Sequence, residues 1–250
     1  MFVAASSECF PDLSLEAALE RLVGLEYTSI EIAIREDSQQ LKPSEVASNL
    51  DRAILACRET QRLTPVAYTA DIQATGDDYF QQFTAICRLA KATKVVSITV
   101  PSAELGTPFN EEIERLRELV RISSLDGVLV SVKTEVGRMT EDPDTAVVLC
   151  DHVKGLGITL DPTHYIYNAK KTNYDQLLKH VYHVQLRDSN KDHFQTRIGQ
   201  GEIEYGRLVT QLGKFRYNRA LSVHIEDLPG SDIDHNGEMR KMRLLLESLL

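Results

Sequence analysis

Eight short runs rich in β-branched residues alternate with helical segments along the whole chain, and this order constrains the fold more than any other feature. Strands joined through helices lie parallel in one sheet, because each helix returns the chain to the edge where the previous strand began. The predicted strands are Phe2–Ser6, Ser29–Ile34, Thr64–Thr69, Lys94–Val100, Val128–Glu135, Gly157–Asp161, Val181–Asp188 and Ala220–Asp227.

The segments between these runs repeat apolar residues at the helical spacing i, i+3, i+4 and i+7. Eight strand–helix units in 250 residues predict a closed (β/α)₈ TIM barrel, formed as a single domain over residues 1–250. An open doubly wound sheet usually has a glycine-rich turn after its first strand, and SSECFPD contains no glycine. The predicted helices are 14–25, 43–60, 77–92, 110–124, 142–153, 173–181, 205–215 and 237–250.

The composition excludes several classes of protein. With 28 Lys and Arg against 37 Asp and Glu, the net charge of −9 argues against a nucleic-acid partner. No run approaches the ~20 apolar residues that a membrane span needs, and the N-terminal segment lacks the basic region of a secretory signal. The four cysteines form no CxxC pair, so we expect a reduced, cytoplasmic protein without a membrane partner. The sequence leaves open whether it forms homo-oligomers.

Alternation within each predicted strand separates an apolar face from a face that becomes polar towards the carboxyl end. In a barrel the polar face points into the lumen, and barrel enzymes place their active sites at the carboxyl-end mouth. Burying many ionisable groups is unfavourable unless they are paired, hydrated or bound to a ligand, which indicates a site; a structural ion-pair network is the alternative. The predicted lumen residues are Glu31, Ser97, Thr99, Lys133, Glu135, Thr159, Asp161, His183, Gln185, His224 and Glu226.

The string GITLDPTHY carries the most chemical information. A predicted strand ends at Asp161, Pro162 turns the chain, and His164 follows three residues after the aspartate. A carboxylate and an imidazole delivered to one spot suit either a divalent metal ion or proton transfer.

Together with HVQLRDS and SVHIED in the last two predicted strands, this string resembles the xylose isomerase-like TIM-barrel superfamily of sugar isomerases, epimerases and apurinic-site endonucleases. The resemblance covers the whole chain and is strongest from Val128 onward. It implies a barrel that isomerises or epimerises a small carbohydrate with a divalent cation (Mn, Mg or Zn). In epimerase members a Glu, an Asp, a His and a Glu from strands five to eight hold the ion. Asp161 and Glu226 match two of these, and His164 matches a histidine that contacts substrate or metal.

Two positions depart from that pattern. Gln185 stands where the resemblance places the ligand histidine, and Lys133 stands where it places the strand-five glutamate. A glutamine carbonyl is a weak ligand for magnesium or manganese, and a charged lysine has no acceptor at all. Glu135, on the same predicted face as Lys133, is the candidate replacement ligand. We therefore expect metal binding to be weak or absent.

Three roles stay open for Lys133. Its ammonium group could neutralise Asp161 and Glu226 in place of the metal ion. It could bind a substrate phosphate or carboxylate while Glu135 serves as the strand-five ligand. As a desolvated amine it could act as a base or a Schiff-base nucleophile.

The predicted function is that of a sugar or sugar-phosphate isomerase or epimerase, with His164, Glu226 and Lys133 as candidate catalytic residues. Two other functions stay open: a barrel that binds a sugar-like ligand without catalysis, and, less favoured, a metal-dependent phosphodiesterase. A phosphodiesterase of this kind requires further histidines on strands two to four, and these predicted strands contain none. The expected substrate contacts are His183, Arg187, Glu31 and His224, with a core role left open for His224.

Overall fold

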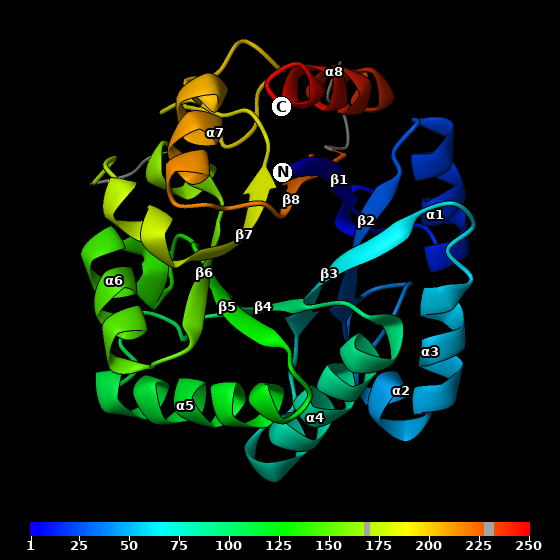
Figure 1. The fold of residues 1–250 in the computed structure, drawn as a ribbon, viewed down its shortest axis with the longest axis vertical. Coiled ribbons are helices and arrows are strands. Elements are labelled where there is room, and N and C mark those ends of the chain that lie inside the picture. The colour runs from blue at the N-terminus through cyan, green and yellow to red at the C-terminus, as the bar shows by residue number, and fades with distance from the viewer. Residues whose placement is uncertain (168–170, 228–232) are drawn as a thin grey trace.

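The eight predicted strands form a closed parallel barrel, which confirms the fold class. The computed structural model describes residues 1–167, 171–227 and 233–250. Every strand pairs in parallel with its neighbours in chain order, and β1 pairs with β8 to close the barrel (Figure 1). The strands are β1 (Phe2–Ser6), β2 (Ser29–Arg35), β3 (Thr64–Asp71), β4 (Ser97–Pro101), β5 (Leu129–Lys133), β6 (Leu156–Leu160), β7 (Val181–Leu186) and β8 (Ala220–Val223).

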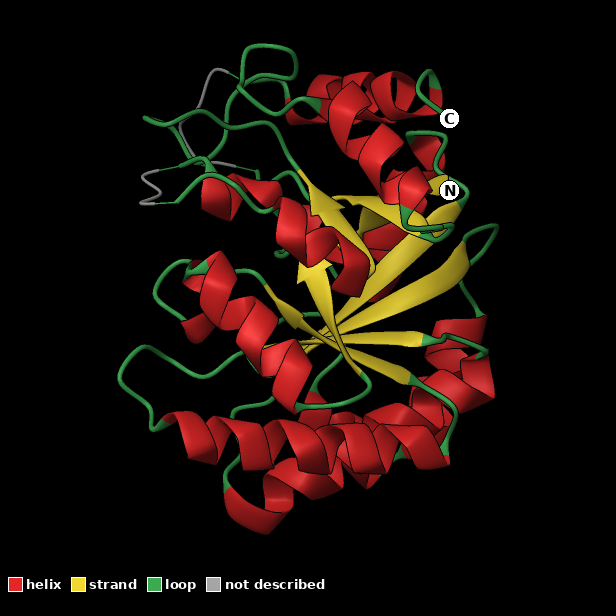
Figure 2. Cartoon of the chain, turned by 60° about the vertical axis from the view of Figure 1, so that its left-hand side comes forward, coloured by secondary structure: helices red, strands yellow, loops and turns green. Residues whose placement is uncertain are grey.

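The helices surround this barrel, so that the strands lie in the middle of the molecule (Figure 2). They are α1 (Leu15–Gly24), α2 (Pro43–Ser48), α3 (Leu50–Arg58), α4 (Gly76–Thr93), α5 (Phe109–Leu125), α6 (Pro143–His152), α7 (Tyr205–Lys214) and α8 (His235–Glu247). Short 3₁₀ helices lie at η1 (Ser7–Cys9), η2 (Met139–Glu141), η3 (Pro162–Tyr165) and η4 (Asp175–His180). In the part of the chain that the structure describes, no helix is long and apolar enough to cross a membrane.

Two predicted helices differ from the structure. The segment 43–60 is two helices, because Asn49 leaves the helical region at φ −146° and its side chain caps α3 by accepting from the Arg52 amide. The segment 173–181 forms the 3₁₀ helix η4 instead of an α-helix. A six-residue element between two buried strands has too few turns for a full amphipathic face.

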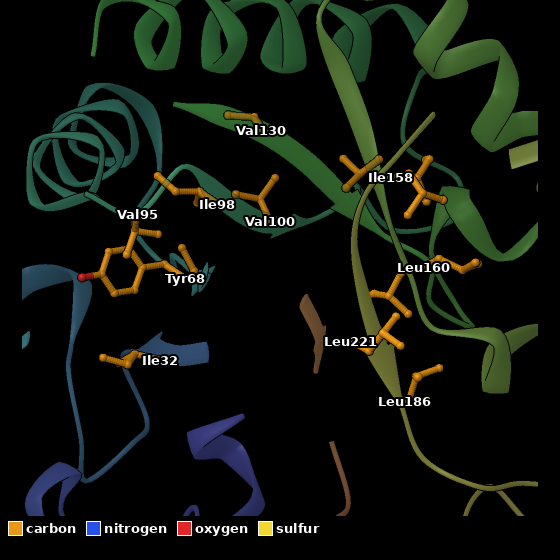
Figure 3. Packing of buried hydrophobic residues seen from close by; sticks show 14 of the residues in the cluster. Ile32, Tyr68, Val95, Ile98, Val100, Val130, Ile158, Leu160, Leu186 and Leu221 are labelled. Carbon is orange, nitrogen blue, oxygen red and sulfur yellow. The ribbon is translucent and has the colours of Figure 1, made fainter. Parts of the chain in front are cut away.

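Apolar side chains on the outer face of the strands form the core between barrel and helices. Ile98, Val130 and Ile158, from three consecutive strands, are almost completely buried in this layer (Figure 3). Burial of an isoleucine side chain contributes about 2 kcal/mol to stability, so the repeated pattern over eight strands stabilises the closed barrel.

Three predicted strands end two or more residues early, which changes the setting of the mouth residues. β5, β7 and β8 end at Lys133, Leu186 and Val223, two to four residues before the predicted ends. Glu135 and Glu226 therefore belong to the loops at the mouth and not to the lumen wall. Strand parity does not fix the direction of a side chain once ladder pairing has stopped.

Deeper in the lumen, hydroxyl side chains pair across the barrel. Thr159 lies 2.7 Å from Thr99 and 2.6 Å from Ser131, oxygen to oxygen. All three residues are fully buried, so these hydrogen bonds satisfy groups that have no access to bulk water. These hydroxyl groups occupy the deeper part of the lumen, and the chemically reactive side chains lie nearer the carboxyl ends of the strands.

Candidate active site

The guanidinium group of Arg187 lies between the carboxylates of Asp161 and Glu226, two residues that the sequence predicts at the site. Arg187 follows β7 and is 1% exposed; its Nη1 donates to Glu226 Oε1 at 2.6 Å. Its Nη2 lies 3.4 Å from Asp161 Oδ2. The predicted substrate contact Arg187 is thus an internal ion-pair partner, bound to groups from two other strand ends.

Asp161 is held at the end of β6 by its own turn. Its Oδ1 accepts the Thr163 amide at 3.0 Å and so caps η3, while its backbone amide donates to Thr134 Oγ1 at 2.8 Å. Burial by itself would raise the pKa of Asp161, but the positive charge of Arg187, with smaller effects from His164 and Lys133, holds that pKa below its ordinary value. The carboxyl is therefore an anion at neutral pH.

His164 is a neutral hydrogen-bond donor in this setting. The Val136 amide donates to its Nδ1 at 3.2 Å, so the proton of the neutral ring is on Nε2, which lies 3.7 Å from Asp161 Oδ2. Burial, which is the largest effect, lowers the pKa of His164 to about 4, although Asp161 opposes it. Because Nδ1 accepts a hydrogen bond and Nε2 carries the proton, the ring can donate a hydrogen bond to a ligand but has no free nitrogen to act as a base.

Lys133 lies among these groups at the end of β5. Its charge lowers the pKa values of Glu8 and Asp161 and disfavours protonation of His164 and His224, residues that follow or belong to β1, β6 and β8. Within residues 1–167, 171–227 and 233–250 its ammonium group has neither a hydrogen bond nor an ion pair. Of the three roles left open, direct neutralisation of Asp161 and Glu226 falls instead to Arg187.

Glu31 contacts a second group of predicted site residues, one layer deeper in the barrel. His183 Nε2 lies 2.8 Å from Glu31 Oε2, and Gln185 Nε2 donates to Glu31 Oε1 at 2.5 Å. Thr69 also donates to this carboxylate. Burial opposes ionisation of Glu31, yet the charge and hydrogen bond of His183 hold its pKa below the ordinary value. The structure thus separates Glu31, His183 and Gln185 from the cluster of Asp161, His164 and Glu226.

Glu8 is a mouth residue that the sequence reasoning missed. It lies in η1 directly after β1, where Arg35 Nη1 donates to its Oε1 at 3.1 Å and His224 Nε2 lies 3.4 Å from its Oε2. Burial, the largest effect, raises the pKa of Glu8 despite the nearby cations. A signal was available: the polar run SSE starts at the last residue of the first strand, on the same side as the other strand ends.

His224 also lacks a full set of partners. It is 4% exposed, and its Nδ1 has no hydrogen bond within the described parts of the chain. Burial and the charges of Arg187 and Lys133 keep the pKa of His224 well below the ordinary value. Glu8, His224 and Glu226 line one cavity of about 330 Å³, between the carboxyl ends of β1, β2 and β8.

Phe194 covers the guanidinium of Arg187. Its ring centroid lies 4.6 Å from the Arg187 Cζ and 5.1 Å from the centroid of the His164 ring. Asp188 holds the loop that carries Phe194, since its Oδ2 accepts the amides of Gly199 at 2.7 Å and Gly201 at 3.0 Å. The sequence reasoning did not identify Phe194, because no local pattern tells which residue of a loop faces the barrel.

Glu135, the predicted replacement ligand, does not join the cluster. Its carboxylate pairs with Arg138, with 3.2 Å between Nε and Oε2. It lies two residues beyond the end of β5, where the chain has already turned away from the ladder.

The side chains present do not fit the four-ligand metal site that the resemblance implies. Arg187 lies between Asp161 and Glu226, where a divalent cation would have to lie. Gln185 turns its amide nitrogen towards Glu31, and Lys133 has no lone pair while charged. Among the described residues, no three His, Cys, Asp or Glu side chains are grouped so as to hold a metal ion. A guanidinium at this position repels a cation and supplies positive charge to both carboxylates.

Known proteins share this architecture. A xylose isomerase domain protein from Alicyclobacillus acidocaldarius matches with a TM-score of 0.77 at 14% identity, over 100% of this chain and 98% of that one. The 3-keto-D-glucoside 4-epimerase of E. coli matches with a TM-score of 0.74 at 15% identity, over 99% of each chain. A xylose isomerase-like TIM-barrel protein from Mycobacterium smegmatis, in complex with magnesium, has a TM-score of 0.77 at 14% identity, over 99% of this chain and 95% of that one. At such identities the likeness shows the fold alone.

No curated protein matches the chain. The sequence family described as xylose isomerase-like TIM barrel, in contrast, matches residues 19–247, which is most of the chain. The closed eight-stranded barrel agrees with that match. The chain therefore belongs to the xylose isomerase-like TIM-barrel family.

Proposed function

We propose that this protein isomerises or epimerises a sugar-like substrate by moving a proton next to a carbonyl group, without a metal ion. Similar structures include sugar epimerases, among them an L-ribulose 3-epimerase and a D-psicose 3-epimerase. The observation that carries the proposal is the cavity lined by Glu8 and Glu226, with the charge of Lys133, which has no partner among the described residues, acting on the wall residues Glu8 and His224. Two carboxyl groups facing one small cavity suit removal and return of a proton.

The two carboxyl groups have different surroundings. Glu226 is half-exposed and held by Arg187 through a single oxygen, whereas Glu8 is largely buried with a raised pKa. An acid of raised pKa can carry a proton closer to neutral pH than an ordinary carboxyl can. The proposed roles are therefore base for Glu226 and acid for Glu8 in one direction, with the roles reversed in the other.

The proton transfer needs a counter-charge for the oxygen. When the carboxylate of Glu226 takes the proton from the carbon beside the carbonyl, the electron pair moves onto the carbonyl oxygen and forms an enediolate. Lys133 supplies a fixed positive charge to that oxygen, and His164 offers its Nε2–H as a second donor. Return of a proton from Glu8 to the carbon completes an epimerisation. Arg187 holds Glu226 in place and keeps Asp161 ionised.

The test is solvent-deuterium incorporation into a panel of ketoses, aldoses and their phosphates, followed by mass spectrometry. Lys133→Met is compared with Lys214→Met, a change of the same kind at an exposed lysine on α7. The proposal expects exchange with at least one compound, unchanged exchange in the Lys214 variant, and loss of about 100-fold or more in the Lys133 variant. Binding without exchange would instead identify a non-catalytic sugar-binding barrel.

A further inference from the structure

A second cavity opens at the mouth on the side opposite Glu8 and Glu226. It has a volume of about 720 Å³ and lies beside the carboxyl ends of β4, β5 and β6. Its walls include the apolar side chains of Leu105, Phe109, Val136 and Met139, with His164 among its lining residues. Glu141, Asp142, Thr145, Tyr167 and Lys171 also line it, so the cavity combines apolar side chains with several polar groups, an arrangement typical of small-molecule sites.

Backbone pairing between two mouth loops holds these apolar groups in place. The Leu105 amide donates to the Gly137 carbonyl at 3.1 Å, and the Met139 amide donates to the Ala103 carbonyl at 2.9 Å. Ser102 and Thr140 hydroxyls, 3.1 Å apart, join the same loops a step deeper. The wall is therefore formed in the free protein and does not have to be assembled by a ligand.

Two of these side chains remain exposed to solvent. Leu105 is 56% exposed and Val136 is 47% exposed, each at the rim of the cavity. Their position is unfavourable in water, and a ligand group that covers them gains about 25 cal/mol for each Å² of apolar surface removed. The occupant that fits this chemistry is a hydrocarbon surface, either an aryl ring or an alkyl chain.

His164 connects this cavity with the proposed reaction site. It lines the apolar cavity, and the charges of Asp161, Lys133 and Glu226 act on its ring. Lys133, at the end of β5, acts electrostatically on His164 on this side of the mouth and on Glu8 and His224 on the other side. A ligand in the mouth can therefore reach polar groups on one side and apolar groups on the other.

We propose that the substrate is a two-part molecule: a polyhydroxylated compound with a free carbonyl group that also carries an aryl or alkyl substituent, such as a sugar with an aryl or alkyl ether on a hydroxyl remote from the carbonyl. The carbonyl part faces Glu8, Glu226 and Lys133, and the apolar substituent fills the cavity of Leu105, Phe109, Val136 and Met139. This inference rests on the proposed function only for the carbonyl part. The apolar subsite stands on its own residues.

Methionine methyl groups provide a direct reporter for the subsite. The chain has 4 methionines; Met139 lines the cavity, whereas Met239 and Met242 are buried on α8. Protein labelled with ¹³C at the methionine methyl groups is titrated with benzyl alcohol, with cyclohexanol and with the polar control erythritol. We expect a saturable shift of the Met139 signal with the two apolar probes, at millimolar concentration, and none with erythritol. The signals of Met239 and Met242 stay in place.

A matched pair of variants separates this site from general surface binding. Leu105 and Leu55 are both 56% exposed, but Leu55 lies on α3, away from the cavity. We expect Leu105→Gln to weaken benzyl alcohol binding at least threefold and Leu55→Gln to leave it unchanged. A silent Met139 signal, or equal effects of the two variants, would overturn the inference. So would sedimentation showing a dimer that Leu105→Gln disrupts, since a second copy of the chain would then cover this surface.

The same titration with Lys133→Met distinguishes failure of the subsite from failure of the proposed chemistry. Benzyl alcohol binding is expected to persist in this variant while deuterium exchange is lost. Persistent binding in a protein that exchanges no substrate would reject the proposed function and support the apolar subsite. Exchange of unsubstituted sugars at rates equal to those of their aryl ethers, which keep the carbonyl free, with no response of Met139, would reject the subsite and support the function.

Discussion

Arg187 donates to Glu226 across 2.6 Å and thereby joins the segment after β7 to the segment after β8. The same guanidinium lies 3.4 Å from the buried Asp161. Removal of one member of a buried ion pair leaves an uncompensated charge, which typically costs about 3 kcal/mol or more. We expect Arg187→Met to lower the free energy of unfolding by about that amount in urea titrations, and Arg88→Met, at an exposed position on α4, to leave it within about 0.5 kcal/mol.

The loss in the free energy of unfolding should be smaller when Asp161, which Arg187→Met leaves unpaired, is neutralised as well. In the double variant Asp161→Asn, Arg187→Met, the loss is expected to be smaller than the sum of the two single losses, because both charges are gone. Additive losses would mean that Arg187 and Asp161 do not interact in solution.

A second prediction concerns the metal site that is typical of the family. We expect the double variant Lys133→Glu, Gln185→His to restore ligands without restoring binding, because the guanidinium of Arg187 still lies between Asp161 and Glu226. Addition of Arg187→Met to this pair should give stoichiometric binding of manganese or zinc, measured by calorimetry and elemental analysis. Stoichiometric metal in the unaltered protein or in the double variant would show that Arg187 does not exclude the ion.

Gly201 provides a test of the loop that carries Phe194. A Cβ atom added at Gly201 would lie 2.0 Å from the Asp188 Oδ1 and 2.5 Å from the Ser189 carbonyl oxygen. We expect Gly201→Ala to lower the free energy of unfolding by about 1–3 kcal/mol and to speed proteolytic cleavage between residues 189 and 201. Gly24→Ala is the control, because nothing lies within 4 Å of its added Cβ. Equal cleavage of the two variants would contradict this role of Asp188.

The pH dependence of stability follows from His164. Its pKa is lowered to about 4 in the folded protein, while an unfolded histidine titrates near pH 6.5. Between these values the unfolded state binds more protons, so stability falls as pH falls through this window and is fully present above pH ~6.5. We expect His164→Gln to remove part of this fall, on the order of 3 kcal/mol, in urea titrations between pH 7 and 4. If the free energy of unfolding falls equally with pH in both proteins, the His164 ring does not lie in the buried cluster.

Much of the fold could be read from the sequence, because strand and helix periods repeat in every unit. The apolar faces of β4 to β6, for example, follow directly from alternation around Ile98, Val130 and Ile158. The strand ends could not be read in the same way. Glu135 and Glu226 keep the alternating pattern past the last ladder pair, so the sequence cannot show where pairing stops.

The candidate site was predictable only as a set of mouth residues. Asp161, His164 and Glu226 come together as expected, since strand ends of a parallel barrel converge. Which cation meets which carboxylate depends on side-chain reach: Arg187, and not Lys133, contacts Asp161 and Glu226. The involvement of Glu8 and Phe194 depends on contacts between loops far apart in the chain, which no local pattern records.

We propose that the positive charge of the candidate active site is supplied by the protein itself. The most direct test of this proposal is the rate of solvent-deuterium exchange into the best substrate of the panel, measured before and after exhaustive treatment with a chelator. We predict rates that agree within about twofold, no gain on adding manganese, magnesium or zinc, and near-complete loss in Lys133→Met. Exchange that disappears with the chelator and returns with a metal ion would contradict the proposal.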